Sequence, residues 1–250
     1  MLLENKVAIV TGGSSGLGLA ITRSIVACGG KVVVGDIDES AGAALAAELK
    51  GVAFLRCDVA SAEDNDALVR KALGTFGALD IAVNNAGISG PFKTLLETDF
   101  AEWKKTFAVN VDGVFLGMRA QIPVMLRRGS GSIINMGSIA SKIGCPVMPA
   151  YIATKHAVDG LSKQAALDFS AKGIRINVVG PGIIETPFVS KAEATGDEAR
   201  AVVAQATAMH PIGRLGRPEE VARLVCWLAS DEASFCTGGY YPVHGGYLAH

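Results

Sequence analysis

The sequence predicts an α/β fold, a doubly wound parallel β-sheet of about seven strands flanked by helices on both faces. Short apolar, β-branched runs alternate with alanine-rich helical stretches along the whole chain. The apolar runs show no polar face, as strands covered on both sides require. Half of the 250 residues are hydrophobic, and no linker or repeat interrupts the pattern. Residues 1–250 are therefore expected to form a single domain.

The expected strands are apolar runs of about six residues. The first, KVAIVT at 6–11, is too apolar for one of its faces to be solvated. The same pattern recurs at 31–36, 52–57, 79–84, 131–136 and 174–179. The tail, 237–250, is rich in glycine and aromatic residues and is interpreted as a last strand with a docked terminus.

Helices are expected at 16–28, 39–50, 62–76, 101–127, 151–171 and 218–229. Asp38 and Pro218 are typical start signals for the second and the last of them. The alternation stops after Pro181, where about thirty polar and alanine-rich residues with several helix breakers follow. Because a long insertion in a compact domain is often functional, we predict a substrate lid at about 183–215.

The composition excludes several classes of protein. The formal net charge is −1, and the basic residues are scattered, so we expect neither a nucleic-acid partner nor an anionic membrane surface. No apolar stretch approaches the roughly 18 residues of a membrane span, and the start lacks a signal layout. The five cysteines show no CxxC spacing, and the four histidines lie far apart. A cytoplasmic protein without a metal site is expected.

A glycine-rich turn joins the first strand to the first helix, with the sequence TGGSSGLG from Thr11 to Gly18. Glycines allow a sharp turn and a close approach of backbone amides to a phosphate, and the helix N-terminus adds partial positive charge. The spacing is G-x-x-x-G-x-G, which is neither the best-known dinucleotide fingerprint nor a P-loop. The turn alone could equally serve a structural purpose.

Asp36 strengthens the interpretation as a nucleotide site. It ends the second strand, 20 residues after Gly16, where a carboxylate would accept hydrogen bonds from ribose hydroxyls and repel the 2′-phosphate of NADP. NAD is therefore the expected cofactor. Asp58 ends the third strand and is placed either to meet the adenine amine or to cap the following helix.

Ser138, Tyr151 and Lys155 are the candidate acid/base group. Tyr151 and Lys155 are four residues apart on one predicted helix and so project from one face. A neighbouring ammonium and a positively charged nicotinamide would both favour the phenolate, and lowering the tyrosine pKa by about 2–3 units takes about 3–4 kcal/mol. Ser138 follows the fifth strand, on the carboxyl edge of the sheet, where its hydroxyl could donate to a substrate oxygen.

In these features the chain resembles the short-chain dehydrogenase/reductase family, in its compact single-domain branch with a Rossmann-type sheet. The matching motifs occur in order along the whole chain: the glycine turn at 11–18, Asn84-Asn85-Ala86-Gly87, Asn110, Ser138, Tyr151 with Lys155, and Pro181-Gly182 with Thr186. One departure is His244, which stands where the family often has Asp in a Val-Asp-Gly-Gly run. It is expected to affect subunit contacts or substrate fit, away from the reacting groups.

The resemblance implies roles for individual positions. Gly12, Ser15, Gly16 and Leu17 would hold the pyrophosphate and its ribose, Asp36 would select NAD, Asp58 and Val59 would receive the adenine, Asn85 would line the ribose channel, and Ile184 and Thr186 would contact the nicotinamide carboxamide. Lys155 would also hold the nicotinamide ribose, beside Tyr151. Asn110 would fix a water molecule that relays protons to Lys155.

The expected function is NAD-dependent interconversion of a secondary alcohol and a ketone, with Tyr151 as the acid/base. The pocket would be mostly apolar, with Ile143, Val147, Met148, Phe188, Val189 and Met209 as candidate lining residues. The resemblance also suggests a homotetramer. Two alternatives stay open: a β-ketoacyl-carrier reductase, which would normally favour NADPH, and a non-catalytic dinucleotide-binding module that reports redox state.

Overall fold

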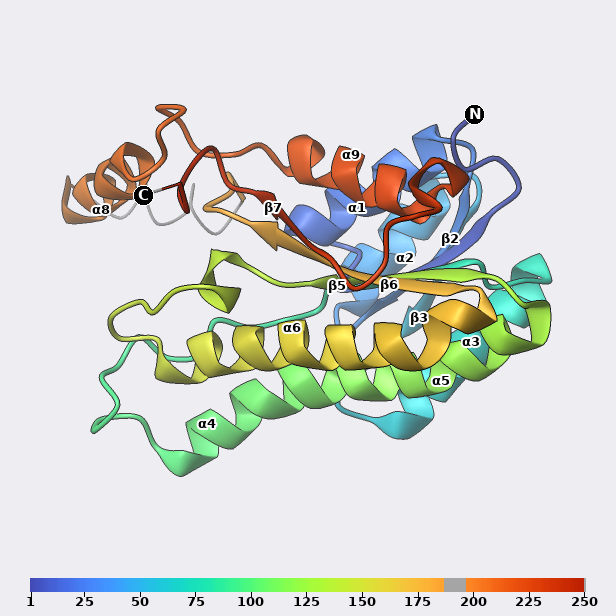
Figure 1. Cartoon of the computed structure of the whole chain (residues 1–250), viewed down its shortest axis with the longest axis horizontal. Coiled ribbons are helices and arrows are strands. Elements are labelled where there is room, and N and C mark those ends of the chain that lie inside the picture. Colours follow the sequence, from blue (N-terminus) through green and yellow to red (C-terminus); the bar gives the residue numbers. More distant parts are fainter. Residues whose placement is uncertain (187–196, 250) are drawn as a thin grey trace.

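A seven-stranded parallel sheet forms the centre of the computed structural model, which describes residues 1–186 and 197–249 (Figure 1). Its strand order is β3-β2-β1-β4-β5-β6-β7. The strands are β1 Val7–Thr11, β2 Lys31–Asp36, β3 Val52–Arg56, β4 Ile81–Asn84, β5 Gly131–Met136, β6 Ile174–Pro181 and β7 Tyr240–Val243. The order reverses direction between β1 and β4, and such a switch point opens a crevice at the carboxyl ends of the strands. The predicted fold class is confirmed.

Helices cover both faces of the sheet. Helices α1 (Gly16–Ala27), α2 (Glu39–Glu48) and α9 (Pro218–Ala229) lie on one face in Figure 1, and α3 (Ala62–Phe76), α5 (Gly113–Arg128) and α6 (Pro149–Phe169) lie on the other. Each layer has its own apolar core, because alternate residues of the central strands point to opposite sides. None of the helices in the described part of the chain is long and apolar enough to cross a membrane.

The helical segment expected at 101–127 is present, but a π-helical turn that was not predicted interrupts its α-helical geometry. It consists of α4 (Phe100–Phe107), a π-helical turn (Ala108–Asp112) and α5. The side-chain amide of Asn110 bonds to backbone groups of Ile88, outside the helix, at 2.8 Å on both its oxygen and its nitrogen. A π turn inserts one extra residue and is common at functional sites. Here it turns the Asn110 side chain towards the end of β4.

Between Pro181 and α9, the described part of the chain contains one helix, α8 (Asp197–Ala208), which lies within the predicted lid. In Figure 1, α8 lies at the upper left, near the C-terminus and above the loops that follow β4 and β5. Before it, the chain at Ile184 forms a parallel bridge with Gly216. The predicted lining residues Phe188 and Val189 lie outside the described residues.

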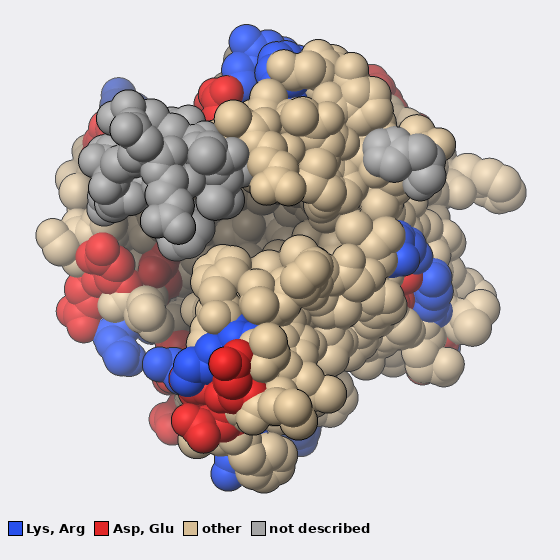
Figure 2. Space-filling model, turned by 90° about the vertical axis from the view of Figure 1, so that its left-hand side faces the viewer, with Lys and Arg blue, Asp and Glu red and all other residues tan. Residues whose placement is uncertain are grey.

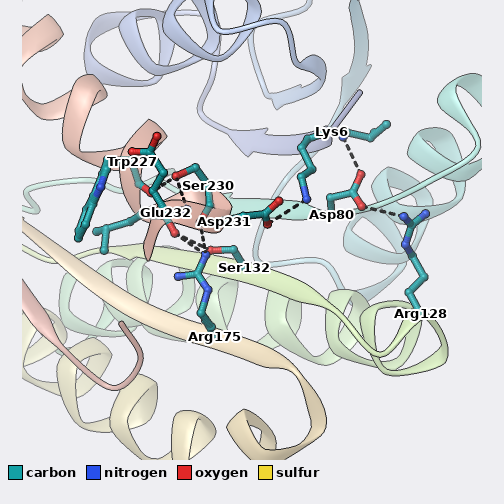
Figure 3. Close-up of polar contacts among 11 residues, drawn as sticks. Lys6, Asp80, Arg128, Ser132, Arg175, Trp227, Ser230, Asp231 and Glu232 are labelled. Atoms are coloured by element: carbon teal, nitrogen blue, oxygen red, sulfur yellow. Dashed lines mark hydrogen bonds and ion pairs between the residues drawn. The ribbon is translucent and has the colours of Figure 1, made fainter. Parts of the chain in front are cut away.

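The amino edge of the sheet is closed by polar contacts around a cavity of about 270 Å³ (Figure 3). Lys6 pairs with Asp231 at 3.1 Å, and Arg128 pairs with Asp80 at 3.0 Å. The guanidinium of Arg175 donates to three carbonyl oxygens at and beyond the end of α9, those of Leu228 (2.8 Å), Ser230 (2.9 Å) and Cys236 (3.2 Å). Because a helix C-terminus carries unpaired carbonyls and partial negative charge, these contacts serve to anchor α9 to the sheet.

Candidate active site

The glycine turn follows β1 at the switch point of the sheet, and two of its glycines are required by its shape. Gly12 has φ +61°, which a side chain would strain. A Cβ on Gly18 would lie 1.9 Å from the carbonyl oxygen of Gly12 and 2.6 Å from Nδ2 of Asn85. The first turn of α1 therefore packs directly on the backbone of the turn, an approach that leaves no room for a side chain at position 18.

The N-terminus of α1 presents backbone amides without a competing side chain. Ser15 is the N-cap residue, but its side chain makes no capping hydrogen bond, and the first turn contains no acidic residue. Gly16 has φ +49°, and nothing lies within 4 Å of the position a Cβ would take. Open amides and open space above a helix N-terminus fit a pyrophosphate, so the residues present are suited to a dinucleotide.

Asn85 ties the turn to the end of β4. Its Nδ2 donates to the carbonyl oxygens of Thr11 (2.9 Å) and Gly12 (3.2 Å). The hydroxyl of Thr11 in turn accepts from the backbone amides of Asn85 (3.0 Å) and Ala86 (3.1 Å). Asn85 thus shapes the wall of the crevice through the backbone. The sequence analysis counted Thr11 in the turn but predicted no role for its hydroxyl. Its place as the last residue of a strand beside a glycine turn could have indicated such a role.

Asp36 ends β2 next to the turn, as expected. Its carboxylate accepts hydrogen bonds from the backbone amide (3.1 Å) and the hydroxyl of Ser14, and from the backbone amide of Asp38 (3.2 Å). A carboxylate offers about four acceptor positions, so these donors leave capacity for a ribose hydroxyl. Ser14, which the sequence did not single out, fixes the carboxylate against the turn.

Asp58 and Val59 lie beyond the end of β3. The carboxylate of Asp58 accepts from the backbone amide of Ala60 at 3.0 Å, which forms a local Asx turn. The N-cap of α3 is Ser61, whose hydroxyl accepts from the amide of Asp64, so the alternative that Asp58 caps this helix is wrong. Val59 is buried beside Gly113 at the start of α5.

The acid/base group forms where β5 and α6 meet. Ser138 follows β5, and its hydroxyl is hydrogen-bonded to the phenol of Tyr151 on α6. One turn later on α6, the Nζ of Lys155 lies 5.5 Å from the centroid of the Tyr151 ring and donates to the carbonyl oxygen of Met136 at 2.8 Å. The spacing of four residues on one helix thus places both side chains on the same face, as predicted.

Burial dominates the ionisation of this group. It raises the pKa of the Tyr151 phenol above its ordinary value, and the hydrogen bond with Ser138 opposes the rise. Burial also lowers the pKa of Lys155 from 10.5 to about 8. The protein by itself therefore raises the pKa of the Tyr151 phenol, whereas a neighbouring ammonium was expected to lower it. The desolvation of both groups is larger than their mutual effect.

The buried Lys155 should make stability depend on pH. Its pKa is about 8 when folded and 10.5 when unfolded, so the unfolded chain binds more protons between these values, and the free energy of unfolding rises with pH there. The rise is on the order of 3 kcal/mol. Relative to a Lys155→Met variant, the wild type should gain this much between pH 7 and pH 10.5 in urea-unfolding measurements. A constant difference between the two proteins would contradict the pKa shift.

Asn110 lies behind the acid/base group. In addition to its bonds with Ile88, its Nδ2 donates to the hydroxyl of Thr154 at 3.1 Å, and Thr154 donates to the carbonyl oxygen of Tyr151 at 2.7 Å. Asn110 is buried, with 1% of its surface exposed. It therefore links the loop after β4 to the helix that carries the tyrosine. Thr154, three residues after Tyr151, was not singled out in the sequence.

The chain beyond β6 forms a hollow of about 310 Å³, lined among others by Ile184, His210 and His244. His210 is buried, and its Nε2 accepts from the backbone amide of Ile183 at 3.2 Å. A Cβ on Gly182 would lie 3.0 Å from the Cα of His244. Because β7 pairs with β6, His244 lies beside the loop that begins after Pro181 and carries Ile184.

Many of the described residues beside the mouth of the crevice are uncharged. Figure 2 looks onto this edge, where uncharged residues border the central hollow below and to the right, and most charged side chains lie further towards the rim of the face. Two of the predicted lining residues are partly open to solvent there, Val147 with 41% and Met209 with 43% of their surface exposed. Val147 has φ +56°, an uncommon conformation for a β-branched residue, and its carbonyl oxygen accepts from the amide of Lys93 at 2.9 Å.

Comparison with known proteins agrees with this geometry. A family model described as "Enoyl-(Acyl carrier protein) reductase" matches residues 12–248. The chain is 42% identical to a cyclohexanol dehydrogenase of Acinetobacter sp. (strain SE19), over 98% of this chain and 96% of that protein. It is also 42% identical to a 2,5-dichloro-2,5-cyclohexadiene-1,4-diol dehydrogenase of Sphingobium indicum, over 99% and 98% of the two chains. The crystal structure of a protein called gox2181 superposes with a TM-score of 0.94 and 32% identity, covering 99% of this chain and 97% of that one.

Proposed function

The chain belongs to the short-chain dehydrogenase/reductase family, and from this membership we propose that its crevice oxidises and reduces the alcohol carbon of a small secondary alcohol with NAD as the cofactor. It is an oxidoreductase that uses a nicotinamide dinucleotide. The observation that carries the proposal is the meeting of the Ser138 hydroxyl, the Tyr151 phenol and the Lys155 ammonium at the same carboxyl edge of the sheet as the glycine turn.

The cofactor would bind across the switch point. The open amides at Gly16 and Leu17 would hold the pyrophosphate, and Asp36 would accept from the adenosine ribose. Beyond β6, Ile184 and Thr186 would meet the nicotinamide end. The bound cofactor supplies the group that accepts or gives the hydride.

In alcohol oxidation, Tyr151 accepts the proton of the substrate hydroxyl through its phenol oxygen. Ser138 donates to the same substrate oxygen and stabilises the charge that develops on it. Lys155 holds positive charge next to the phenol, which favours the phenolate. Asn110 would support proton exchange between Lys155 and solvent through the loop after β4. In ketone reduction the same groups act in the reverse order.

The preference for NAD should depend on the Asp36 carboxylate. We expect Asp36→Ala to lower the ratio of kcat/KM with NAD⁺ to kcat/KM with NADP⁺ at least tenfold, because the negative charge that would face a 2′-phosphate is removed. Steady-state kinetics with both cofactors measures this ratio. Ser14→Ala is the matched control, because it removes the hydroxyl that ties Asp36 to the turn and keeps the carboxylate. An unchanged ratio in Asp36→Ala would place the selecting charge elsewhere.

The substrate we propose is an apolar secondary alcohol, in particular an alicyclic one. The uncharged residues among those described beside the crevice favour it, and two similar proteins are named for cyclic alcohols. A screen of NAD⁺ reduction over cyclohexanol, linear secondary alcohols, polyols and hydroxysteroids tests the proposal. Turnover highest with the alicyclic alcohols is expected. Turnover only with polyols or charged alcohols would overturn it.

A second candidate is the reduction of a β-ketoacyl group on a carrier protein; the description of the family model names a reductase of a different carrier-bound group, the enoyl group. That reaction would normally use NADPH. Parallel assays of NADH and NADPH oxidation, with ketones and with a β-ketoacyl thioester, separate the two functions.

We propose a cytoplasmic homotetramer as the working form. Small residues on α6, namely Ala153, Ala157 and Gly160, would permit another subunit to approach closely. A Cβ on Gly160 would meet nothing within 4 Å, so this position has room for a neighbouring helix. Light scattering that yields the mass of one chain would overturn the assembly.

A further inference from the structure

Tyr240 lies on β7, yet its phenol reaches the active site. Its hydroxyl donates to the carbonyl oxygen of Ser138 at 2.9 Å, a contact between residues 102 positions apart in the sequence. Tyr240 pairs in register with Val178 on β6, so its side chain crosses β6 to reach the residue that follows β5. We propose that Tyr240 is a positioning residue, which holds the backbone of Ser138 so that the Ser138 hydroxyl faces Tyr151. The role in turnover rests on the proposed function, whereas the anchoring itself does not.

A glycine in β6 makes room for this contact. A Cβ on Gly180 would lie 2.1 Å from the hydroxyl oxygen of Tyr240 and 2.2 Å from Cζ of its ring. Glycine in the interior of a strand weakens it and often marks a close approach of another group. The phenol of Tyr240 is the group that approaches here, and any side chain at position 180 would push it away from Ser138.

Lys142 also contacts the ring of Tyr240. Its Nζ lies 4.4 Å from the centroid of the Tyr240 ring, within the range of a cation–π contact. The same ammonium pairs with the carboxylate of Asp159 on α6, which is only 8% exposed and also accepts from Lys163 at 2.9 Å. Lys142 follows the short helical turn that begins after Ser138. Tyr240 therefore contacts both ends of this five-residue segment.

The anchoring fixes the serine backbone from two directions. The carbonyl oxygen of Ser138 also accepts from the amide of Ser141 at 2.8 Å, so both of its lone pairs are used. Burial, with the charge of Asp159, raises the pKa of Tyr240 to about 12, so its hydroxyl remains a donor throughout an assay at pH 7–9. Because a hydroxyl that stabilises developing charge must be placed within a fraction of an ångström, losing one anchor should reduce turnover.

The kinetic test replaces Tyr240 with phenylalanine, which keeps the ring and removes the hydroxyl. We expect kcat for alcohol oxidation to fall about three- to tenfold, the size of one neutral hydrogen bond, while KM for NAD⁺ stays within twofold. Tyr241→Phe is the matched control, because Tyr241 is the next residue on β7 and packs in the core on the opposite face of the sheet. It should leave kcat unchanged.

A double-mutant cycle separates positioning from a general loss of structure. In a Ser138→Ala background, Tyr240→Phe should lower kcat by less than 1.5-fold, since there is no serine hydroxyl left to position. An equal loss in both backgrounds, or an equal loss in Tyr241→Phe, would overturn the proposal.

Hydrogen exchange followed by mass spectrometry tests the anchoring without any turnover. The peptide covering residues 137–142 should exchange at least tenfold faster in Tyr240→Phe than in the wild type, and at the wild-type rate in Tyr241→Phe. Faster exchange together with a wild type that oxidises no alcohol would leave the anchoring in place and overturn the proposed function. Unchanged exchange in Tyr240→Phe would overturn the anchoring itself.

Discussion

Tyr151→Phe should lower kcat for alcohol oxidation by about 10²–10⁴, the usual contribution of a positioned proton acceptor. The substitution removes one oxygen from a buried ring and leaves its packing unchanged, so folding should be preserved. The remaining turnover would come from the position of the substrate and from the Ser138 hydroxyl. Steady-state rates of NADH formation measure the loss, and fluorescence titration with NADH measures cofactor affinity.

The pH dependence adds a second readout to this prediction. Because burial raises the pKa of the Tyr151 phenol and the hydrogen bond with Ser138 lowers it, Ser138→Ala should move the rising limb of the oxidation rate to higher pH. Tyr151→Phe should lose that limb. If the phenylalanine variant kept the full rate and the full pH profile, Tyr151 would have no part in the proton transfer.

Gly18→Ala should have the second large effect, on both folding and cofactor binding. The added Cβ would lie 1.9 Å from the carbonyl oxygen of Gly12, and backbone cannot rotate away as a flexible side chain can. Helix α1 must then move off the turn, at a cost of about 3 kcal/mol or more. The same movement takes the open amides at the start of α1 away from the pyrophosphate, so affinity for NADH should fall at least a hundredfold.

Gly74→Ala is the matched control for this substitution. Gly74 also lies in a helix, α3, but nothing is within 4 Å of the position of its Cβ. Replacing a helical glycine by alanine in open space stabilises by up to about 1 kcal/mol. In urea unfolding, Gly18→Ala should therefore lower the stability and Gly74→Ala should raise it. In NADH titration, only Gly18→Ala should lose affinity. Equal stability of both variants would contradict the close approach at Gly18.

The α/β architecture and the position of its crevice could be predicted because they follow from local patterns. A buried parallel strand is apolar over its whole length, whereas a helix that covers the sheet is apolar on one face only. The alternation of such strands and helices leaves few topologies open. The glycine turn could be recognised because its residues are contiguous. The pair Tyr151 and Lys155 could be recognised because four residues make about one helical turn.

Other features follow from packing between distant elements. The π turn at Asn110 directs its side chain to bonds with Ile88, 22 residues earlier, and helical periodicity carries no sign of such a partner. The place of His244 beside Gly182 follows from the pairing of β7 with β6. The capping of α3 by Ser61 depends on where the helix actually starts, and element boundaries are weakly encoded.

The sequence by itself determined the strand and helix order, the glycine turn and the identity of the serine, tyrosine and lysine at the carboxyl edge. Only the tertiary structure decided how these groups ionise and what holds them. The phenol of Tyr151 and the ammonium of Lys155 differ from free side chains chiefly through burial, and burial depends on every element that covers them. The contact between Tyr240 and Ser138 exists because β5 and β7, far apart in the chain, are separated in the sheet only by β6.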